Sequence, residues 1–326
     1  MPNTTDYLTE NEIINENEGL SEKSKRRLSQ SKSENTIKAY DADWRDFVDW
    51  CTYHHMESMP ASPETIVNYV SDLADNAKAN TVARRVTAIS ENHIAAGYDR
   101  ESNPAKSGIV RAAIASIRRE KGTFQHGKAP ILMETLSLLA DSLEGDDIVT
   151  LRDKALLYLG FAGAFRRSEL VNVTVENLTF TPQGLIVFIP RAKGDQLGKG
   201  STIAIPYSPS PRTCAVRAVH DWIEASGIKE GPLFRPFNKS CGIRDRGLSD
   251  KSVALIVKKY IARAGLDPDD FAGHSLRRGF ATSAAQHDVD TLSIMRQTRH
   301  KSEKMVHRYI EQGNLFKDNP LNKMFK

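Results

Sequence analysis

The sequence predicts a mostly α-helical protein, built as two helical domains of which the second carries a small antiparallel β-sheet. Apolar residues recur every three or four positions along most of the chain, which is the spacing of an amphipathic helix. Two short β-rich runs around a Gly/Lys turn break this pattern and predict a hairpin within 185–206. An aperiodic segment with two glycines and a proline, residues 122–130, is predicted to be the linker between the domains.

The first domain is expected to span residues 33–121 and to contain four or five helices, preceded by a flexible tail at 1–32 that has few large apolar residues. The second helix is predicted to begin with Ser62 as its N-cap and Pro63 at the first helical position. A third helix is expected from Asn80, and a fourth after Pro104. The first helix of this domain is predicted by an apolar stripe of Ile37, Tyr40, Trp44, Phe47, Val48 and Cys51.

The second domain is expected to span residues 131–326, and it is again mostly helical. The hairpin strands are the runs LIVFIP at 185–190 and STIAIP at 201–206, joined by a polar turn. Helices are predicted at about 131–143, 148–164, 252–265, 280–287 and 301–310.

The composition is that of an ordinary globular protein, with 40% hydrophobic and 26% charged residues. No apolar run approaches the roughly 18 residues of a membrane span, and the acidic first residues lack the layout of a secretory signal. The three cysteines are far apart, which favours a reducing cytoplasm over a disulfide framework or a zinc site. The turn GDQLGKGS lacks the spacing of a phosphate-binding P-loop, so neither a metal nor a nucleotide cofactor is predicted.

The net charge of +4 hides an uneven distribution of charge. Residues 1–20 carry five acids and no Lys or Arg, whereas residues 105–128 hold six bases against one acid, Glu120. A clustered positive surface is typical of proteins that bind polyanions, although the same charges also fit a solvated helix face. Composition alone therefore leaves nucleic-acid binding open.

Four segments of the second domain carry residues that could take part in catalysis, and each has an ordinary structural explanation when taken alone. GAFRRSEL at 163–170 holds Arg166 and Glu169, which suit a surface ion pair. Lys193 lies at the predicted hairpin tip, where lysine is common. His274 and Arg277 are three residues apart at a predicted helix start, so they share a face.

The fourth segment, RHKSEKMVHRYI at 299–310, places His300 nine residues before Tyr309. By periodicity Tyr309 belongs to an apolar stripe, so it also fits an ordinary core position. None of the four segments is convincing by itself.

Their order and spacing closely resemble the tyrosine recombinases, also called phage-type integrases. The pattern is Arg-x-Ser/Ala-Glu-Leu/Ile, a hairpin lysine, His-x-x-Arg, and a His or Trp nine residues before a tyrosine. The segment TIKAYDADWRDFVDWC at 36–51 also resembles the first helix of a Cre-type core-binding domain. The resemblance carries over onto Arg166, Glu169, Lys193, His274, Arg277, His300 and Tyr309.

The resemblance implies a tyrosine recombinase fold and a site-specific recombinase that cleaves and rejoins double-stranded DNA. Arg166 and Arg277 would hold the phosphate, whose negative charge grows during attack. Tyr309 would be the nucleophile and form a covalent 3′-phosphotyrosine link, with His274 as the acceptor of its proton. Lys193 would protonate the departing 5′-oxygen.

The two remaining residues have supporting roles in the resemblance. His300 would donate a hydrogen bond to the phosphate, and Glu169 would fix its basic neighbours. The phosphoester is exchanged rather than hydrolysed, so neither ATP nor a metal is expected.

The sequence departs from the family pattern at two positions. Arg299 stands where a small residue is usual, and Arg167 stands where a bulky aliphatic residue is usual. Both are expected to add positive charge near the phosphate. The hairpin lysine is ambiguous, because Lys199 lies in the same turn as Lys193.

If the resemblance holds, the two domains clamp opposite faces of the DNA duplex. The C-terminal residues 318–326, with Leu321, Met324 and Phe325, are expected to dock into a neighbouring protomer and build a tetramer on two paired sites, or else to fold back on their own domain. A first segment of about 32 residues is short for a separate arm-binding domain, which favours a simple Cre-like system. The residues expected to contact bases or phosphates are Lys38, Arg84, Arg85, Arg111 and Arg118.

Two other functions are alternatives, of which the first is mechanistically close and would be separated by a requirement for two sites and strand exchange between them. A type IB topoisomerase-like nicking and closing enzyme also uses a tyrosine nucleophile, but it acts without a second site. A non-catalytic DNA-binding protein of the same fold has no need of a tyrosine at position 309.

Overall fold

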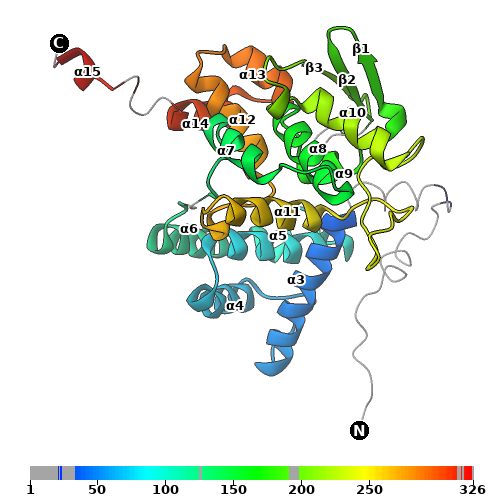
Figure 1. The fold of residues 1–326 in the computed structure, drawn as a ribbon. Helices are drawn as coiled ribbons and strands as arrows, with labels where there is room; N and C mark the ends of the chain where they lie inside the picture. The colour runs from blue at the N-terminus through cyan, green and yellow to red at the C-terminus, as the bar shows by residue number, and fades with distance from the viewer. Residues whose placement is uncertain are drawn as a thin grey trace. The chain divides into compact units, whose positions relative to one another are not determined.

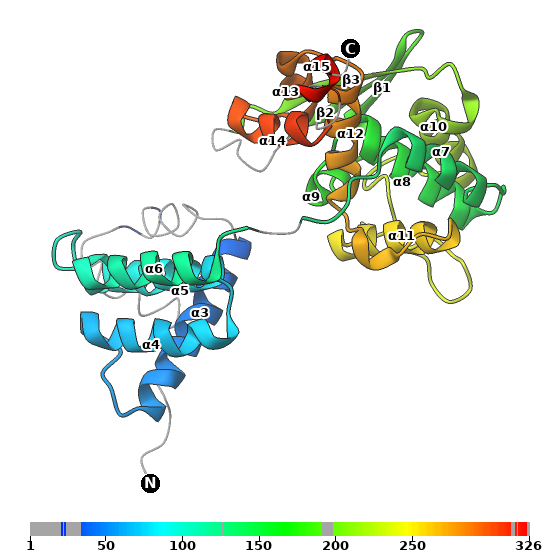
Figure 2. The ribbon, with the colours of Figure 1, turned by 90° about the vertical axis from the view of Figure 1, so that its left-hand side faces the viewer.

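The computed structural model describes residues 34–124, 127–190, 198–313 and 319–324, together with residues 21, 23 and 317. The chain divides into two compact units, Met1–His126 and Gly127–Lys326, and this boundary falls inside the segment 122–130. Figure 1 and Figure 2 show the elements of each unit. Within the described residues, no helix combines the length and the apolar character needed to cross a membrane.

The described part of the first unit is helical throughout. Its core is formed where α3 packs against α5 and α4 packs against α6, with Phe47, Ile66, Val82 and Val110 fully buried. The elements are α3 (Glu34–Tyr53), α4 (Pro63–Asn76), α5 (Ala79–Ala95), a 3-10 turn (Pro104–Lys106) and α6 (Gly108–Lys121). The helices predicted from the apolar stripes are therefore present.

Local hydrogen bonds explain where these helices begin and how they are joined. The Ser62 hydroxyl accepts the backbone N–H of Thr65 at 3.1 Å, as expected for the N-cap of α4. His93 is fully buried on α5, where its Nδ1 lies 2.8 Å from the carbonyl oxygen of Ile89 and its Nε2 accepts the N–H of Ala61 at 3.0 Å. These contacts require the neutral ring with its hydrogen on Nδ1.

The second unit is also mostly helical. Its helices are α7 (Met133–Ser142), α8 (Ile148–Ala162), α9 (Arg167–Val171), α10 (Ala215–Ser226), α11 (Asp250–Arg263), α12 (Ser275–Gln286), α13 (Thr291–Thr298), α14 (Glu303–Gly313) and α15 (Leu321–Met324). Short 3-10 turns lie at Val175–Asn177, Pro211–Thr213 and Pro268–Asp270. This confirms the mostly α fold class.

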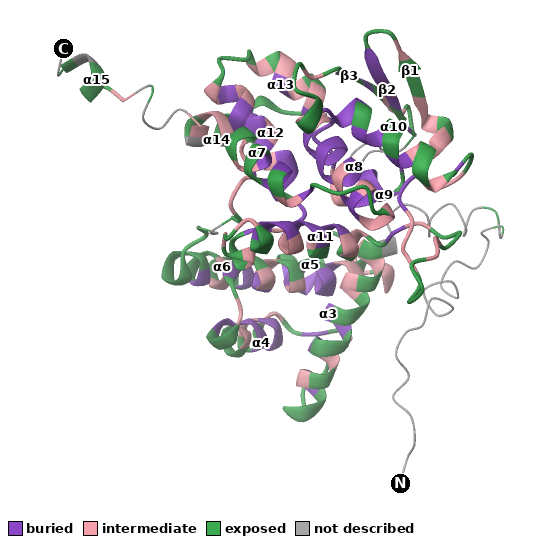
Figure 3. Ribbon diagram, viewed as in Figure 1, coloured by how far each residue is buried: buried purple, intermediate pink, exposed green. Residues whose placement is uncertain are grey.

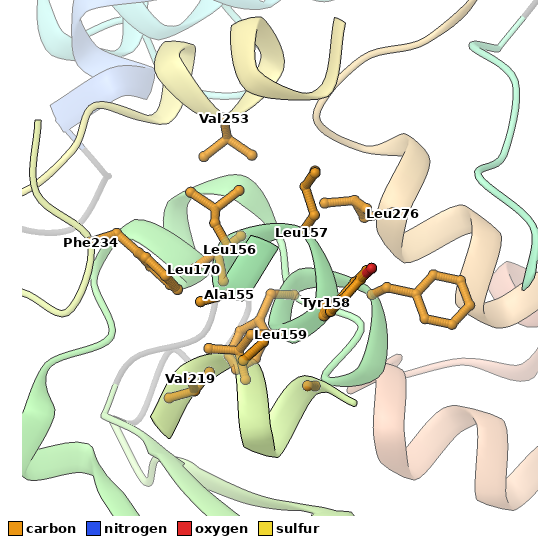
Figure 4. Close-up of a cluster of buried hydrophobic side chains, with 14 of the residues drawn as sticks. Ala155, Leu156, Leu157, Tyr158, Leu159, Leu170, Val219, Phe234, Val253 and Leu276 are labelled. Atoms are coloured by element: carbon orange, nitrogen blue, oxygen red, sulfur yellow. The ribbon is translucent and has the colours of Figure 1, made fainter. Parts of the chain in front are cut away.

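Helix α8 forms the centre of the second core. Its run from Ala155 to Phe161 is buried on every side, which is the pattern of a helix enclosed by other elements rather than lying at the surface. Helix α8 packs against α10 and α12, with Val219 and Leu276 among its neighbours (Figure 4). The buried residues of α8 are purple in Figure 3. The end of α8 is thereby held in place, and the site described below begins there.

The described residues of the second unit form one antiparallel sheet in the order β1-β2-β3. Strands β2 (Gly184–Ile189) and β3 (Ser201–Pro206) form the predicted hairpin, with Ile203 and Ile205 turned inward. Strand β1 (Leu178–Thr181) was not predicted. It has four residues, of which the two central ones are exposed, so its apolar pattern is weak.

Helix α12 lies very close to the start of the second unit. A methyl group at Gly279 would lie 1.7 Å from the carbonyl oxygen of Ile131, so only glycine fits there. Helices α13 and α14 pack on α12 through a small apolar cluster of Ala281, Ala285, Ile294 and Val306. The packing of α12 thus determines where the residues of α12, α13 and α14 meet the end of α8.

Candidate active site

The first arginine of the predicted site lies at the N-cap of α9. After α8 the chain turns through Ala164, whose φ of 45° is left-handed, and reaches Arg166. Glu169 accepts the backbone N–H of Arg166 at 3.0 Å and its Nη1 at 2.5 Å. The Arg166 side chain is 15% exposed, so it is held by the carboxylate but is not completely buried.

The second arginine, Arg277, is on α12 and is only 4% exposed. Its Nη1 donates to the carbonyl oxygen of Ala164 at 2.7 Å, and its Nη2 is buried without a hydrogen-bond partner. Burial, followed by the charges of Arg166 and Arg299, lowers the pKa of Arg277 to about 9. The guanidinium is still charged at pH 7, and it lacks an anion.

One carboxylate serves this group of arginines. Glu169 is 4% exposed, with one oxygen held by Arg166 and the other accepting Nη2 of Arg299 at 2.9 Å. Burial by itself would raise the pKa of Glu169, but the charge of Arg299 and the hydrogen bonds and charge of Arg166 hold it below the usual value. Three guanidinium groups and one carboxylate leave an excess of positive charge.

His300 is buried directly after α13, with its ring orientation fixed by a hydroxyl group. The Thr298 hydroxyl lies 2.6 Å from the carbonyl oxygen of Ile294, so its single hydrogen is donated there. Nδ1 of His300 lies 2.7 Å from the same hydroxyl oxygen and must therefore donate to it. In the neutral ring, Nε2 is consequently an acceptor.

The electrostatic surroundings keep His300 neutral in the free protein. Burial, followed by the charges of Arg277, Arg166 and Arg299, lowers the pKa of His300 to about 4. The predicted hydrogen bond to phosphate needs a hydrogen on Nε2, and a neutral ring of this tautomer has none there. A bound anion would offset the arginine charges and favour the protonated form.

Tyr309 lies on α14, half-buried against the small apolar cluster of α12, α13 and α14. Its ring centroid is 5.8 Å from that of His300, with 32° between the ring planes. The predicted stripe is present, since Val306 is fully buried and Ile310 packs against the same cluster. Tyr309 is thus at the edge of this cluster, beside His300, and is not enclosed by it.

The remaining predicted site residues differ in their structural environment. His274 is exposed at the N-cap of α12, in agreement with the predicted helix start. Lys193 lies outside the described residues, so the structure does not place it. Lys199 is exposed just before β3 and has interactions of its own.

The two arginines that depart from the family pattern differ in burial and in their ion-pair partners. Arg299 is buried, and its charge is compensated by Glu169, which the sequence did not predict. Arg167 is partly exposed, and its nearest carboxylate oxygen is that of Asp250 at 3.9 Å. The positive charge expected from Arg299 near the phosphate is therefore largely offset by a partner.

The residues predicted to contact DNA are in the first unit, where the structure divides them into two groups. Arg111 and Arg118 are exposed together on α6, opposite the buried Val110 and Ile117, as predicted. Lys38 is exposed on α3 and has interactions of its own.

Arg84 and Arg85, in contrast, form ion pairs within the first unit. Arg84 pairs with Asp43, and Arg85 pairs with Asp46 and donates to the Tyr69 hydroxyl at 2.8 Å. DNA contact by these two arginines would require competition with the carboxylates of α3. The sequence pattern does not reveal these pairs, because their partners are about forty positions away.

Three supporting residues were not identified as part of the site from the sequence. Ala164 provides the carbonyl oxygen that Arg277 binds, and Thr298 fixes His300. The Gln297 side chain donates to the carbonyl oxygen of Ala162 at 2.8 Å. Only Ala164 and Thr298 could have been suspected from the sequence, because each lies two residues before a predicted site residue.

No group of three or more His, Cys, Asp or Glu side chains suited to a metal ion occurs in the part of the chain that the structure describes. The described site instead consists mainly of hydrogen-bond donors and positive charge. Such a donor set fits an anion.

Comparisons with known proteins agree on one family. Residues 132–314 match the model of the phage integrase family. An integrase/recombinase xerD homolog from Selenomonas ruminantium is 67% identical over 318 residues, which cover 98% of this chain and 93% of that protein. The tyrosine recombinase XerD of Yersinia pestis is 25% identical over 272 residues, covering 81% of this chain and 82% of that protein.

Solved structures share the fold. The integrase of transposon Tn1549, in complex with transposon right end DNA, has a TM-score of 0.59 at 14% identity and covers 92% of both chains. The XerH site-specific recombinase bound to its difH substrate has a TM-score of 0.54 at 14% identity, covering 84% of this chain and 76% of that one. The mostly helical architecture with a small antiparallel sheet is common to them.

Proposed function

The chain belongs to the phage integrase family of site-specific tyrosine recombinases, and from this premise we propose which of its residues break and rejoin DNA. Tyr309 is the nucleophile that attacks a DNA phosphodiester held by Arg166 and Arg277. Its product is a covalent 3′-phosphotyrosine link between the enzyme and one strand.

The observation that carries this assignment is the uncompensated cation at Arg277. Its Nη2 is buried without a partner, and the only carboxylate in contact with the described arginine cluster already binds Arg166 and Arg299. A buried donor without an acceptor is costly, so the site favours a ligand that brings negatively charged oxygens. A phosphodiester supplies them, and the charge that develops on its oxygens during attack strengthens the same contacts.

The atoms of the cleavage step balance without a cofactor. The phenolic oxygen of Tyr309 forms a bond to phosphorus, the bond to the 5′-oxygen breaks, and that oxygen leaves as a hydroxyl. His274, exposed at the start of α12, accepts the phenolic proton. Lys193 of the hairpin turn supplies the proton to the leaving oxygen, with Lys199 as the alternative. Attack by a 5′-hydroxyl of a second strand reverses the step and joins new partners.

Two residues support this chemistry. Glu169 holds the Arg166 side chain and the backbone at the start of α9. His300, neutral in the free site, takes up a proton when the phosphate anion binds and then donates from Nε2. Its position depends on Thr298, which holds Nδ1.

The test is covalent capture on a suicide DNA substrate. Duplexes nicked so that the cleaved fragment is lost, drawn from a library of candidate sites, are incubated with the protein and analysed for a protein–DNA adduct. The unmodified protein is expected to form the adduct, and Tyr309→Phe is expected to form none. Tyr207→Phe is the matched control, because Tyr207 is an exposed tyrosine of the same unit. An adduct that persists in Tyr309→Phe would refute the assignment.

Recombination further requires DNA recognition and assembly. We assign phosphate or base contacts to Lys38, Arg111 and Arg118, and also to Arg84 and Arg85 once the α3 carboxylates release them.

The C-terminal segment docks on a second protomer, so that four chains assemble on two paired sites. Leu321 and Met324 are 46% and 72% exposed, which suits a docking segment. Deletion of residues 318–326 is expected to preserve binding to one site and to abolish the pairing of two sites in a gel-shift assay. Normal recombination by the truncated protein would disprove the docking role.

A further inference from the structure

Arg299 occupies a backbone position that is unfavourable for a long side chain. It follows the last residue of α13 with φ 56° and ψ 41°, in the left-handed region that glycine adopts most easily. Its side chain is only 7% exposed, so a charged group is also withdrawn from water. The contacts made by the side chain must offset both costs.

The guanidinium of Arg299 connects the end of α13 with the end of α8. Nη1 donates to the carbonyl oxygens of Gly163 at 2.9 Å and Gln297 at 2.8 Å. Nη2 donates to the carbonyl oxygen of Ala164 at 3.1 Å and to Oε2 of Glu169 at 2.9 Å. A cation that binds the last carbonyl groups of a helix also interacts favourably with the helix dipole.

These acceptors also hold the two arginines proposed to bind the phosphate. The Ala164 carbonyl oxygen accepts Nη1 of Arg277, and the other oxygen of Glu169 accepts Nη1 of Arg166. His300 directly follows Arg299 in the chain. One side chain therefore contacts the support of each arginine and restrains the backbone next to the histidine.

Arg299 is not arranged to bind the phosphate itself. Each of its terminal nitrogens already has two acceptors within the protein, so neither offers a free N–H to a phosphate. Nε is buried without a hydrogen-bond partner, and it is the single donor of this side chain that is left over. The side chain also lies over the Phe165 ring, 5.1 Å from its centroid. Its effect on the reaction must therefore pass through other residues.

We propose that Arg299 is a positioning residue for DNA cleavage, which fixes the Ala164 carbonyl and the Glu169 carboxylate and thereby orients Arg277 and Arg166 toward one phosphate. The inference rests on the proposed function of the site. Without Arg299, Glu169 has one cationic partner instead of two, and the Ala164 turn is tied to α12 alone. Small misplacements of this kind cost up to about 100-fold in rate, because the phosphate contacts act only at the right geometry.

The experiment compares Arg299→Gly and Arg299→Lys with the unmodified protein. Glycine fits the left-handed backbone without strain, and lysine keeps the charge but presents one nitrogen instead of a fork. Single-turnover adduct formation is measured on the suicide substrate at saturating DNA, with DNA affinity measured separately. Arg296→Gln, an exposed position on the same helix, controls for the loss of one positive charge.

In Arg299→Gly the adduct rate constant is expected to fall about 10- to 100-fold while DNA affinity is nearly unchanged. Arg299→Lys should recover part of this loss, and Arg296→Gln should match the unmodified protein. Loss of the nearby cation should also raise the pKa of His300, because Arg299 is among the charges that lower it. The pH–rate profile of Arg299→Gly should consequently move to higher pH, whereas a purely structural defect would lower the rate without moving the profile.

The outcomes separate this inference from the proposed function. If the unmodified protein forms no adduct through Tyr309, the proposed function fails. If the adduct forms and Arg299→Gly reacts at the same rate as the unmodified protein, only the positioning role is refuted. The same holds if Arg299→Gly loses DNA affinity and rate equally while its pH–rate profile does not move. If circular dichroism shows that Arg299→Gly does not fold, Arg299→Lys decides alone: an unchanged rate would refute the inference, and a reduced rate with unchanged affinity would support it.

Discussion

Replacing Arg277 by alanine is expected to abolish most DNA cleavage while leaving the fold intact. Arg277 donates once within the protein, through Nη1 to Ala164, and its Nη2 is a buried donor that lacks a partner. The Ala164 carbonyl oxygen keeps a second donor, Nη2 of Arg299 at 3.1 Å, when Arg277 is removed. The variant therefore leaves no buried carbonyl without a donor at this position.

The magnitude follows from the single donor group of Arg277 that is proposed to face the phosphate. A unit charge about 4 Å from an anion is worth about 4 kcal/mol at an effective dielectric constant of about 20. Loss of one donor aimed at a developing oxyanion costs about 2.7–4 kcal/mol, or about 100- to 1,000-fold in rate. The Coulomb energy thus lies at the upper end of the loss expected for one such donor. In the free protein, removing Arg277 also relieves repulsion with Arg166 and Arg299, which offsets part of the lost packing.

The assay is single-turnover adduct formation with the suicide substrate, combined with thermal unfolding. Arg277→Ala is expected to lose about 100- to 1,000-fold in rate constant, and Arg277→Lys should recover part of it because the charge remains. Arg278→Ala, the next residue on α12, is the matched control and should keep the rate of the unmodified protein. A loss of less than tenfold in a folded Arg277→Ala protein would contradict the view that this buried cation binds the reacting phosphate.

Two further predictions concern the first unit. Arg111→Ala should weaken binding to all DNA sequences and reduce the slope of log affinity against log salt by about one unit; an unchanged slope in salt-titrated gel shifts would exclude a phosphate contact. Burial lowers the pKa of His93 below its unfolded value of 6.5. The stability that the neutral ring contributes is therefore complete above about pH 6.5 and is lost as the pH falls through the lowered pKa. The free energy of unfolding falls by up to about 1.4 kcal/mol per pH unit in this window. Urea unfolding from pH 7 to 5 should show this extra acid sensitivity in the unmodified protein and not in His93→Gln, whose amide oxygen can still accept the Ala61 N–H; equal acid sensitivity would disprove the role of His93.

The sequence was informative wherever structure depends on neighbouring residues. The apolar stripe of the first helix predicted the burial of Phe47 and Cys51, and Ser62 was correctly placed as an N-cap. The hairpin was predicted from the β-rich content of its two strands. Strand β1 was missed because four residues with an exposed centre carry little periodic signal, and pairing with β2 stabilises it.

The sequence was less informative about charge pairs between distant segments. Lone arginines at positions 84, 85 and 299 suggest free positive charge, yet each has a carboxylate partner. Glu169 and Arg299 are 130 positions apart, and no local pattern joins them. Only the packing of α12 against α8, and of α13 against α12, brings them into contact, so their pairing is a property of the fold.

The same packing explains why the site can gather several cations with one carboxylate. Isolated buried arginines would repel each other and would be expelled to solvent, but here Arg277 and Arg299 have acceptors that the backbone already provides. The end of α8 supplies the carbonyl oxygens of Gly163 and Ala164 to Arg299 and Arg277. Helix-end carbonyls carry partial negative charge, so they stabilise the guanidinium groups without neutralising them. The cations remain concentrated, and the unmatched positive charge suits the DNA phosphate that the site is proposed to bind.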